Sequence, residues 1–274
     1  MEEIRNTAQG RRPPAMAAVA AIVPAYNEQE TIIEVLKVLQ ATPLIQEVLV
    51  VSDGSTDETV EIARSHGYKT IHLRQNQGKG IAMAVGVAHT DAEILTFVDG
   101  DILNLTVEQL TRLIEPVVSG ASGMNVGVRD RGWALNDFQR QHGPLLSGIR
   151  CLRREVFEAV PESHLEGFAI ETGLNWACAE LGLPITTTVL HNLKHLVKEK
   201  KRGLVSGFRA RMRMFAAVFG AYMVLRLKHP SLRSAAAASG SSGSGGSGGA
   251  AGGGAGTGQI GGQILQPELE YINF

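Results

Sequence analysis

The sequence predicts an α/β fold in which helices cover both faces of a mainly parallel sheet. Strand-like and helix-like segments alternate through the first half of the chain, as expected for consecutive strand–helix–strand units. Hydrophobic residues make up 44% of the chain, which allows a sizeable core. Polar residues directly follow three of the strand-like segments, and ligands bind at this edge of such a sheet. The fold therefore predicts where a site should lie.

The elements follow from apolar runs, helical spacing and terminating residues. Strands are expected over residues 17–23, 47–51, 69–73, 94–98, 124–128, 147–153 and 185–190. Helices are expected after residues 27 and 55 and over 80–89, 106–118, 170–181 and 204–227. Pro24 is expected to end the first strand. Asn27 with Glu30, and Ser55 with Glu58, have the spacing of a capping box and predict two helix starts.

The composition divides the chain into four parts. Residues 1–16 are charged and contain proline, which predicts a loose N-terminal arm. Residues 17–233 are expected to form the globular domain, with a first half over 17–105 and a second half over 106–233. Residues 234–262 are almost entirely Ala, Gly and Ser, as in a flexible linker. Residues 263–274 regain apolar side chains and form a C-terminal peptide.

Residues 194–233 contain eleven Lys or Arg and one acid, although the whole chain has a net charge of −1. Such an excess favours an anionic partner. The predicted helix 204–227 is basic and amphipathic, so it can lie on an anionic membrane or pack on the domain or in a homodimer. Both readings stay open; nucleic-acid binding is disfavoured. We expect a cytoplasmic protein, or one peripheral on the inner membrane face, without signal peptide or membrane span.

Asp99 and Asp101 are the sharpest functional signal. They stand one residue apart directly after a predicted strand, so both carboxylates can turn toward one cation. Mg²⁺ and Mn²⁺ favour carboxylates together with substrate phosphate oxygens. Such an ion would stabilise a departing diphosphate as a Lewis acid. A plain turn is the alternative.

Two further residues stand at predicted strand or helix ends. Asp53 follows an apolar run and suits the N–H of a base or a ribose hydroxyl. Lys79 lies between two glycines at a predicted helix start, where backbone N–H groups and the ammonium could meet a base or phosphate. A solvated lysine is an equal alternative. The pattern lacks the third glycine of a dehydrogenase loop after Gly80 and any phosphate loop of P-loop proteins.

Four linked motifs resemble family 2 glycosyltransferases of the GT-A fold. They are Pro-Ala-Tyr-Asn-Glu at 24–28, Ser-Asp-Gly-Ser-Thr-Asp at 52–57, Asn-Gln-Gly-Lys-Gly at 76–80 and Asp-Gly-Asp at 99–101. The resemblance covers residues 19–105. It implies that the half 17–105 binds the nucleotide and that the half 106–233 binds the acceptor. It implies an inverting, metal-dependent transferase that uses a UDP- or GDP-linked sugar. By the same resemblance the nucleotide sugar is bound by Pro24, Ala25, Tyr26, Glu28, Asp53, Gly54, Lys79, Asp99 and Gly100, and the metal, Mg²⁺ or Mn²⁺, by Asp99 and Asp101.

The second half resembles the family more loosely. Glu171, in Gly-Phe-Ala-Ile-Glu, looks like the acceptor-side carboxylate and is the candidate base for an inverting transfer, with Glu166 as the second candidate. For Glu171, an acid favoured by the helix dipole is the alternative. Gly-Val-Arg at 127–129 and Ser-Gly-Ile-Arg at 147–150 resemble polyprenyl- and dolichyl-phosphate sugar transferases. The resemblance implies that Arg129, Arg131 and Arg150 lie near an acceptor phosphate. It also suggests His191 as a third metal contact.

These signals leave alternatives open. The acceptor can be a polyprenyl phosphate or a small soluble hydroxyl compound such as phosphoglycerate. A non-catalytic module that binds nucleotide sugars is an alternative of another class. A nucleotidyltransferase is disfavoured, because residues 24–28 are unlike the Gly-rich, Arg-containing loop that such enzymes usually carry after the first strand.

Overall fold

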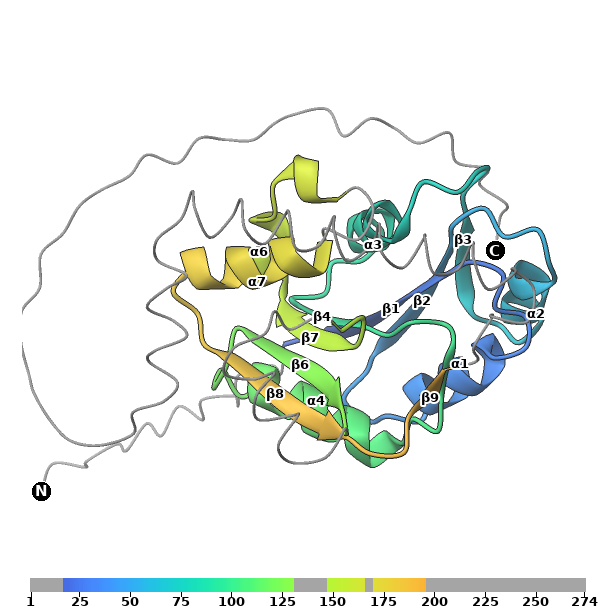
Figure 1. Ribbon diagram of the computed structural model, residues 1–274. Helices are drawn as coiled ribbons and strands as arrows, with labels where there is room; N and C mark the ends of the chain where they lie inside the picture. The colour runs from blue at the N-terminus through green and yellow to red at the C-terminus, as the bar shows by residue number, and fades with distance from the viewer. Residues whose placement is uncertain (1–16, 131–146, 166–169, 196–274) are drawn as a thin grey trace, which may run out of the picture.

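The computed structural model of the chain describes residues 17–130, 147–165 and 170–195 (Figure 1). These residues form a seven-stranded sheet in the order β3-β2-β1-β4-β7-β6-β8. Its strands are β1 (Val19–Ala25), β2 (Glu47–Ser52), β3 (Lys69–His72), β4 (Ile94–Phe97), β6 (Met124–Arg129), β7 (Arg150–Arg153) and β8 (Ile185–Leu190). Two short strands, β5 (Ile102–Leu103) and β9 (Lys194–His195), pair separately.

The sheet is parallel except for β7, which pairs antiparallel with both β4 and β6. The carboxyl ends of the other six strands therefore share one edge with the start of β7. Segments far apart in sequence meet at this edge, which we call the C-terminal edge. The predicted α/β fold with a mainly parallel sheet is confirmed.

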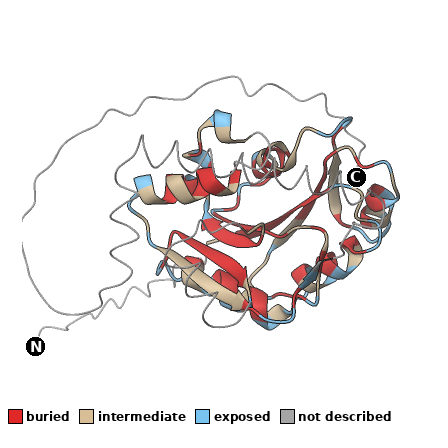
Figure 2. Ribbon diagram, in the orientation of Figure 1, coloured by how far each residue is buried: buried red, intermediate tan, exposed pale blue. Residues whose placement is uncertain are grey.

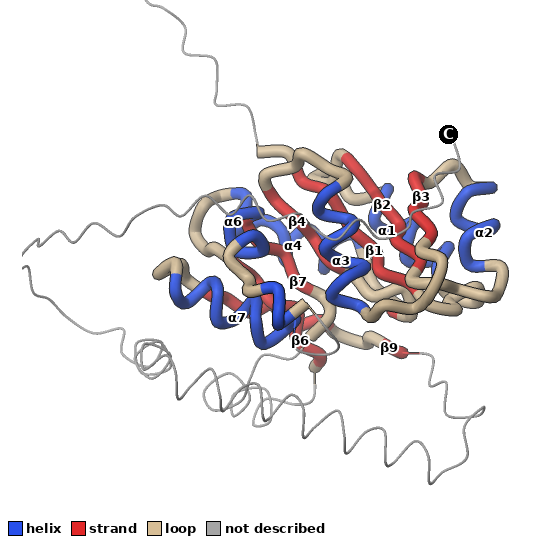
Figure 3. Tube along the Cα trace, turned by 90° about the horizontal axis from the view of Figure 1, so that it is seen from above, coloured by secondary structure: helices blue, strands red, loops and turns tan. Residues whose placement is uncertain are grey.

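Helices cover both faces of the sheet, and each face has its own core. The helices are α1 (Ile32–Gln40), α2 (Thr59–Ser65), α3 (Lys79–Ala88), α4 (Val107–Val118), α6 (Arg154–Glu158) and α7 (Ile170–Glu180), with a 3-10 turn η1 (Glu162–His164). Helices α1, α2 and α4 pack on one face and α3, α6 and α7 on the other (Figures 1 and 3). The central strands between them are buried (Figure 2).

Pro24 does not end the first strand, as the sequence had suggested, because β1 continues to Ala25. The register of β1 with β4 runs only from Val19 to Ile22, whereas its register with β2 continues to Ala25. Proline has no N–H to donate, so a strand tolerates it where one side has no ladder partner. The strand thus carries the chain further toward the C-terminal edge than expected.

Both predicted helix starts were wrong. Helix α1 begins after Thr31 and α2 after Glu58. Asn27 instead has a left-handed backbone (φ 56°), and its Oδ1 accepts a hydrogen bond from the Thr56 N–H at 2.8 Å. Ser55 Oγ accepts one from the Asn27 N–H at 3.1 Å. These polar side chains tie the loops after β1 and β2 together instead of capping helices.

Some predictions fall outside the described residues. They are the N-terminal arm, the basic helix 204–227, the linker, the C-terminal peptide, Arg131 and Glu166. In the described ranges, no helix combines the length and the apolar character that crossing a bilayer requires.

Candidate active site

Three strand ends that the sequence singled out lie together at the C-terminal edge. The Asp53 N–H, just after β2, donates to the Ala25 carbonyl at the end of β1, at 2.8 Å. The Gly100 carbonyl, after β4, accepts from the Thr31 hydroxyl at 2.7 Å, ahead of α1. A methyl group on Gly100 would lie 3.2 Å from Glu28 Cγ and 3.3 Å from Ala25 Cβ. The loops after β1, β2 and β4 are therefore in direct contact.

Asp53 holds the loop that precedes α3. Its side chain is 4% exposed. Oδ1 accepts from the Gln77 N–H at 2.7 Å, and Oδ2 accepts from the Gly78 N–H at 2.9 Å. Both carboxylate oxygens are thus engaged by the loop at the start of α3. Direct contact of Asp53 with a nucleotide stays a prediction, but its support of this loop is a structural role that the sequence did not reveal.

Gly54 allows the same loop to come close. Its φ is 71°, in the left-handed region that favours glycine. A Cβ there would lie 2.6 Å from the Asn76 nitrogen, inside contact distance. Asn76 also donates from its side chain to the Asp53 carbonyl at 3.2 Å. The motifs at 52–57 and 76–80 thus contact each other closely along their backbones. This contact fixes the start of α3 against β2.

Four residues at and just after the end of β1 were predicted to bind the nucleotide sugar. Two of them are buried within the strand, and two follow it. Pro24 and Ala25 are buried in β1, whereas Tyr26 is 43% exposed and Glu28 half-buried. The Glu28 carbonyl accepts from the N–H groups of Thr31 and Ile32 at the start of α1. Tyr26 is thus the most accessible of these four side chains for a planar base.

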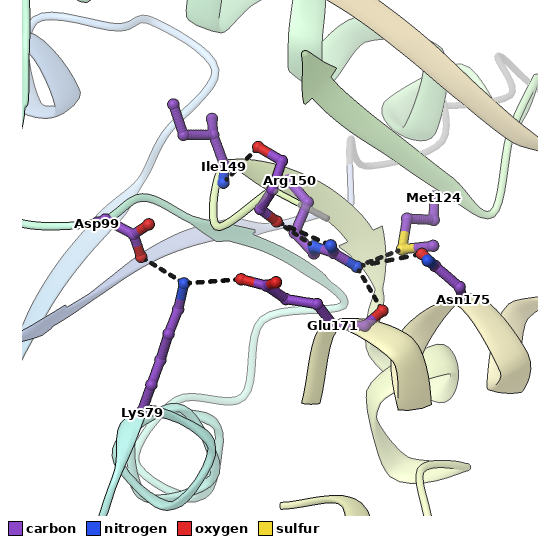
Figure 4. Close-up of polar contacts among 8 residues, drawn as sticks. Lys79, Asp99, Met124, Ile149, Arg150, Glu171 and Asn175 are labelled. Atoms are coloured by element: carbon purple, nitrogen blue, oxygen red, sulfur yellow. Dashed lines mark hydrogen bonds and ion pairs between the residues drawn. The ribbon is translucent and has the colours of Figure 1, made fainter. Parts of the chain in front are cut away.

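Lys79 joins the two halves of the domain. Its Nζ lies 2.6 Å from Asp99 Oδ1 and 3.2 Å from Glu171 Oε1, at the start of α7 (Figure 4). The three side chains are 17–26% exposed. Burial alone would lower the pKa of Lys79, but the charges and hydrogen bonds of Asp99 and Glu171 raise it above its ordinary value. Lys79 thus stays an ammonium between the carboxylates of Asp99 and Glu171.

Gly148, ahead of β7, packs directly on this ion pair. A Cβ at Gly148 would overlap both Asp99 Oδ2 and Lys79 Nζ. The Ser147–Gly148 segment can therefore cover the pair only without a side chain at 148. The sequence showed Ser-Gly as a motif but could not show what it touches, since 49 residues separate Asp99 and Gly148.

Arg150 is buried at the start of β7. Its side chain is 1% exposed. Its N–H groups donate to the Ser147 carbonyl at 2.8 and 3.0 Å, to the Glu171 carbonyl at 3.3 Å and to Asn175 Oδ1 at 3.4 Å (Figure 4). Burial lowers the pKa of Arg150, while the charges of Glu171 and Asp99 act in the opposite direction. The predicted acceptor role of Arg150 does not fit this interior position.

Arg129 lies at the end of β6, also at the C-terminal edge. Its Nη2 is buried and has no hydrogen-bond partner in the described part of the chain. A buried guanidinium nitrogen costs free energy unless it is bonded, so this atom is a candidate anion contact.

His191 follows β8 and is tied to the neighbouring strand. Its Nδ1 lies 2.7 Å from Asp130 Oδ2, and its carbonyl accepts from the Gln109 side chain at 2.8 Å. Within residues 17–130, 147–165 and 170–195, no three His, Cys, Asp or Glu side chains are grouped to hold a metal ion. The role of His191 as a metal ligand therefore stays a prediction. In backbone register it is His195, in β9, that lies opposite Ile102, the residue after Asp101.

Comparison with known proteins agrees with this arrangement. Residues 20–168, over half of the chain, match the family model described as glycosyl transferase family 2. The chain is 30% identical over 192 residues to glycosyltransferase AglJ of Haloferax volcanii, covering 63% of this chain and 62% of the relative. It is 27% identical over 143 residues to undecaprenyl-phosphate 4-deoxy-4-formamido-L-arabinose transferase of Edwardsiella ictaluri, covering 48% and 42%. The chain thus spans less than two thirds of these relatives.

A solved structure shows the same fold. Glucosyl-3-phosphoglycerate synthase from Mycobacterium tuberculosis, in complex with Mn²⁺ and UDP-glucose, superposes with a TM-score of 0.61 at 25% identity, covering 74% of this chain and 78% of that one. The match to the family model extends through all four motifs to the Ser-Gly segment and η1. With its strand-end loops and acidic residues in this arrangement, the chain belongs to glycosyl transferase family 2.

Proposed function

We propose that the chain transfers a sugar, with inversion, from a nucleoside-diphosphate sugar to an acceptor that carries a phosphate group. The observation that carries this proposal is the position of Lys79, 2.6 Å from Asp99 and 3.2 Å from Glu171. Asp99 belongs to the donor motif and Glu171 to the acceptor-side helix. A donor and an acceptor brought to these two carboxylates would meet beside one fixed ammonium.

In the proposed reaction the bond between the anomeric carbon and the diphosphate oxygen breaks, and the electron pair leaves with the nucleoside diphosphate. The acceptor oxygen forms the new bond from the opposite face. A hydroxyl acceptor must lose its proton as this bond forms, and Glu171 is the proposed recipient. Glu171 Oε1 lies 3.2 Å from Lys79 Nζ, a contact that fixes the position of this carboxylate.

A divalent cation fits the donor chemistry of Asp99 and Asp101. Mg²⁺ is commonly held by one or two carboxylates together with substrate phosphates, and so does not need a cluster of three protein ligands. When bound, such an ion would supply positive charge to the leaving diphosphate. Mg²⁺ or Mn²⁺ is therefore the proposed cofactor. His191 stays the proposed third contact.

The nucleotide is proposed to lie over the loops after β1 and β2. Tyr26 is exposed there, and Asp53 holds the backbone of the loop before α3. The N-terminus of α3 points backbone N–H groups and partial positive charge into the same region, which suits an anionic donor. UDP- and GDP-linked sugars both satisfy this arrangement.

The acceptor is proposed to be anionic because of Arg129. Its buried Nη2 has no partner among the described residues, and a phosphate oxygen would provide one. A relative is named for its undecaprenyl-phosphate substrate, and the solved relative is named for phosphoglycerate. Both compounds carry phosphate. A polyprenyl phosphate, which would place the chain at a membrane surface, is the proposed acceptor; a phosphoglycerate-type hydroxyl compound is the second candidate, favoured by the position of Glu171.

The proposal is tested first by ligand binding. Only a ligand that binds the folded state raises the melting temperature, so UDP-glucose, GDP-mannose and dTDP-glucose are screened with and without Mn²⁺. Asp101→Ala should remove the Mn²⁺-dependent part of the shift and the turnover. Transfer is then assayed with undecaprenyl phosphate in vesicles and with 3-phosphoglycerate. Binding without transfer or hydrolysis would support the non-catalytic module instead.

A further inference from the structure

We propose that Arg150 is a positioning residue, which places Glu171 for the reaction by holding the first turn of α7 against the Ser147–Gly148 segment. The inference rests on the proposed function and deepens it. Arg150 is 1% exposed, so its guanidinium has almost no surface with which to contact a donor or an acceptor directly. Its effect on catalysis must therefore pass through the groups it holds.

Arg150 contacts two separate segments of the site, the one before β7 and the first turn of α7 (Figure 4). On one side, Nε and Nη2 both donate to the Ser147 carbonyl, at 3.0 and 2.8 Å. On the other, Nη1 donates to the Glu171 carbonyl at 3.3 Å and to Asn175 Oδ1 at 3.4 Å. The guanidinium is planar and its donors point in fixed directions, so it sets the distance and the angle between the two segments.

The two segments that Arg150 holds, Ser147–Gly148 and the first turn of α7, both contact the Lys79–Asp99 ion pair. Gly148, next to Ser147, packs on Asp99 and Lys79 so closely that no Cβ fits. Glu171 is in turn 3.2 Å from Lys79 Nζ. Arg150 therefore closes a ring of contacts through Gly148, Lys79 and Glu171. Loosening this ring would let Glu171 move relative to the donor side, and a displacement of about 1 Å can cost about 100-fold in rate.

The chain contains a matched control. Like Arg150, Arg154 donates to backbone carbonyls, in its case those of Ala92, Thr90 and Val87. These lie ahead of β4, at the opposite edge of the sheet from Asp99. Replacing either arginine by lysine removes guanidinium bonds to backbone carbonyls, but only Arg150 is connected to Glu171.

The experiment is a double-mutant cycle between Arg150→Lys and Glu171→Gln, with Arg154→Lys as control. Turnover of UDP-glucose and GDP-mannose with Mn²⁺ is followed as transfer to 3-phosphoglycerate, whose hydroxyl must lose a proton. It is also followed as slow hydrolysis, in which water is the acceptor and its proton also needs a base. We expect Arg150→Lys to lower kcat about 100-fold with donor KM changed less than about threefold. In the Glu171→Gln background it should add less than about threefold, because residues that act through one group are not additive.

A structural role alone predicts something different. In that case the two effects would multiply, or Arg154→Lys would lower kcat as much as Arg150→Lys at equal loss of melting temperature; either result overturns the inference. Should Arg150→Lys fail to fold, Asn175→Ala removes one acceptor of the same guanidinium and should lower kcat, again only when Glu171 is intact. If the wild-type protein transfers sugar but the two single-mutant effects are additive in the double mutant, this inference alone is overturned. If the wild-type protein shows no turnover at all, the proposed function is overturned as well.

Discussion

Lys79 Nζ lies 2.6 Å from Asp99 Oδ1, across the C-terminal edge of the sheet from the start of α3 to the end of β4. The first carboxylate of the Asp-Gly-Asp motif therefore already has a protein cation beside it. A metal ion that binds Asp99 must share this carboxylate with the ammonium or displace it, so Lys79 and the metal are linked.

Replacing Lys79 by methionine tests this link. Without the ammonium, Asp99 and Glu171 attract a divalent cation more strongly, so the affinity for Mn²⁺ in the absence of nucleotide should rise, by about tenfold if the change is about 1.4 kcal/mol. Donor turnover should fall. Titration with Mn²⁺, followed by calorimetry, measures the first effect. Lys69→Met is the control, because Lys69 forms a similar 2.9 Å pair with Glu47 at the other edge; equal Mn²⁺ affinity in wild type and Lys79→Met would contradict the link.

Glu171→Gln should separate the two acceptor classes. With 3-phosphoglycerate the attacking hydroxyl needs a base, and transfer should fall about 10²–10⁴-fold. With undecaprenyl phosphate the attacking oxygen is already ionised, and the loss should stay below about tenfold. Donor binding, measured by thermal shift, should be retained in both cases. Glu180→Gln, at the other end of α7, is the control; loss of donor binding in Glu171→Gln alone would show that the carboxylate acts on the donor side.

Gly148→Ala should damage the site more than the fold. The added methyl group overlaps Asp99 and Lys79, so the ion pair or the Ser147–Gly148 segment must shift. We expect at least about a tenfold fall in kcat/KM, which corresponds to about 1.4 kcal/mol of transition-state stabilisation. Gly123→Ala also forces an overlap, with Leu183, but at the opposite edge. Gly123→Ala should have a lower melting temperature and an unchanged kcat/KM. If instead Gly123→Ala lowers kcat/KM and Gly148→Ala does not, Gly148 is not part of the site.

Asp53→Asn should weaken donor binding through the loop before α3. An amide can accept with its oxygen but not with its nitrogen, so one of the bonds to the N–H groups of Gln77 and Gly78 is lost. Donor KM should rise about fivefold to tenfold, for a lost hydrogen bond of about 1 kcal/mol. Steady-state kinetics of Asp57→Asn supply the comparison. That carboxylate also accepts from two backbone N–H groups, those of Thr59 in α2 and Gln29 ahead of α1, but not from the loop before α3. Unchanged donor KM in Asp53→Asn would exclude this support.

Stability should decrease at high pH because of the two buried thiols. Burial raises the pKa of Cys151 and of Cys178 to about 12, from an ordinary value of 9.0. Above pH 9 the unfolded thiols lose their protons while the folded ones keep them, so the unfolded state binds fewer protons and the free energy of unfolding falls with pH. The loss is about 1.4 kcal/mol per thiol at pH 10. Urea unfolding at pH 8 and 10 measures it.

The matched variant is Cys178→Ala, which removes one of the two thiols. It is less stable at pH 8, since a buried side chain is truncated, but its loss between pH 8 and 10 should be smaller by about 1.4 kcal/mol. An identical loss in both proteins would show that Cys178 ionises equally in the folded and unfolded states.

The spacing of apolar residues in the sequence was sufficient to predict most of the strands and helices. Apolar runs located the strands to within a few residues, because a strand buried on both faces needs continuous apolar side chains. The helix starts failed at Asn27 and Ser55 for an identifiable reason. Their side chains have the right chemistry for a cap, but hydrogen bonds to the neighbouring loop won, and those partners are 28 or more residues away.

The sequence by itself determined the fold class, the family and the set of acidic and basic residues at the strand ends, since these depend on side-chain type and short spacing. Only the tertiary structure decided how these residues are used. Arg150 is interior because β7 runs between β4 and β6, and Lys79 meets Glu171 because α3 and α7 pack on the same face of the sheet. Contacts between residues 92 positions apart depend on strand order and packing, which no short pattern encodes.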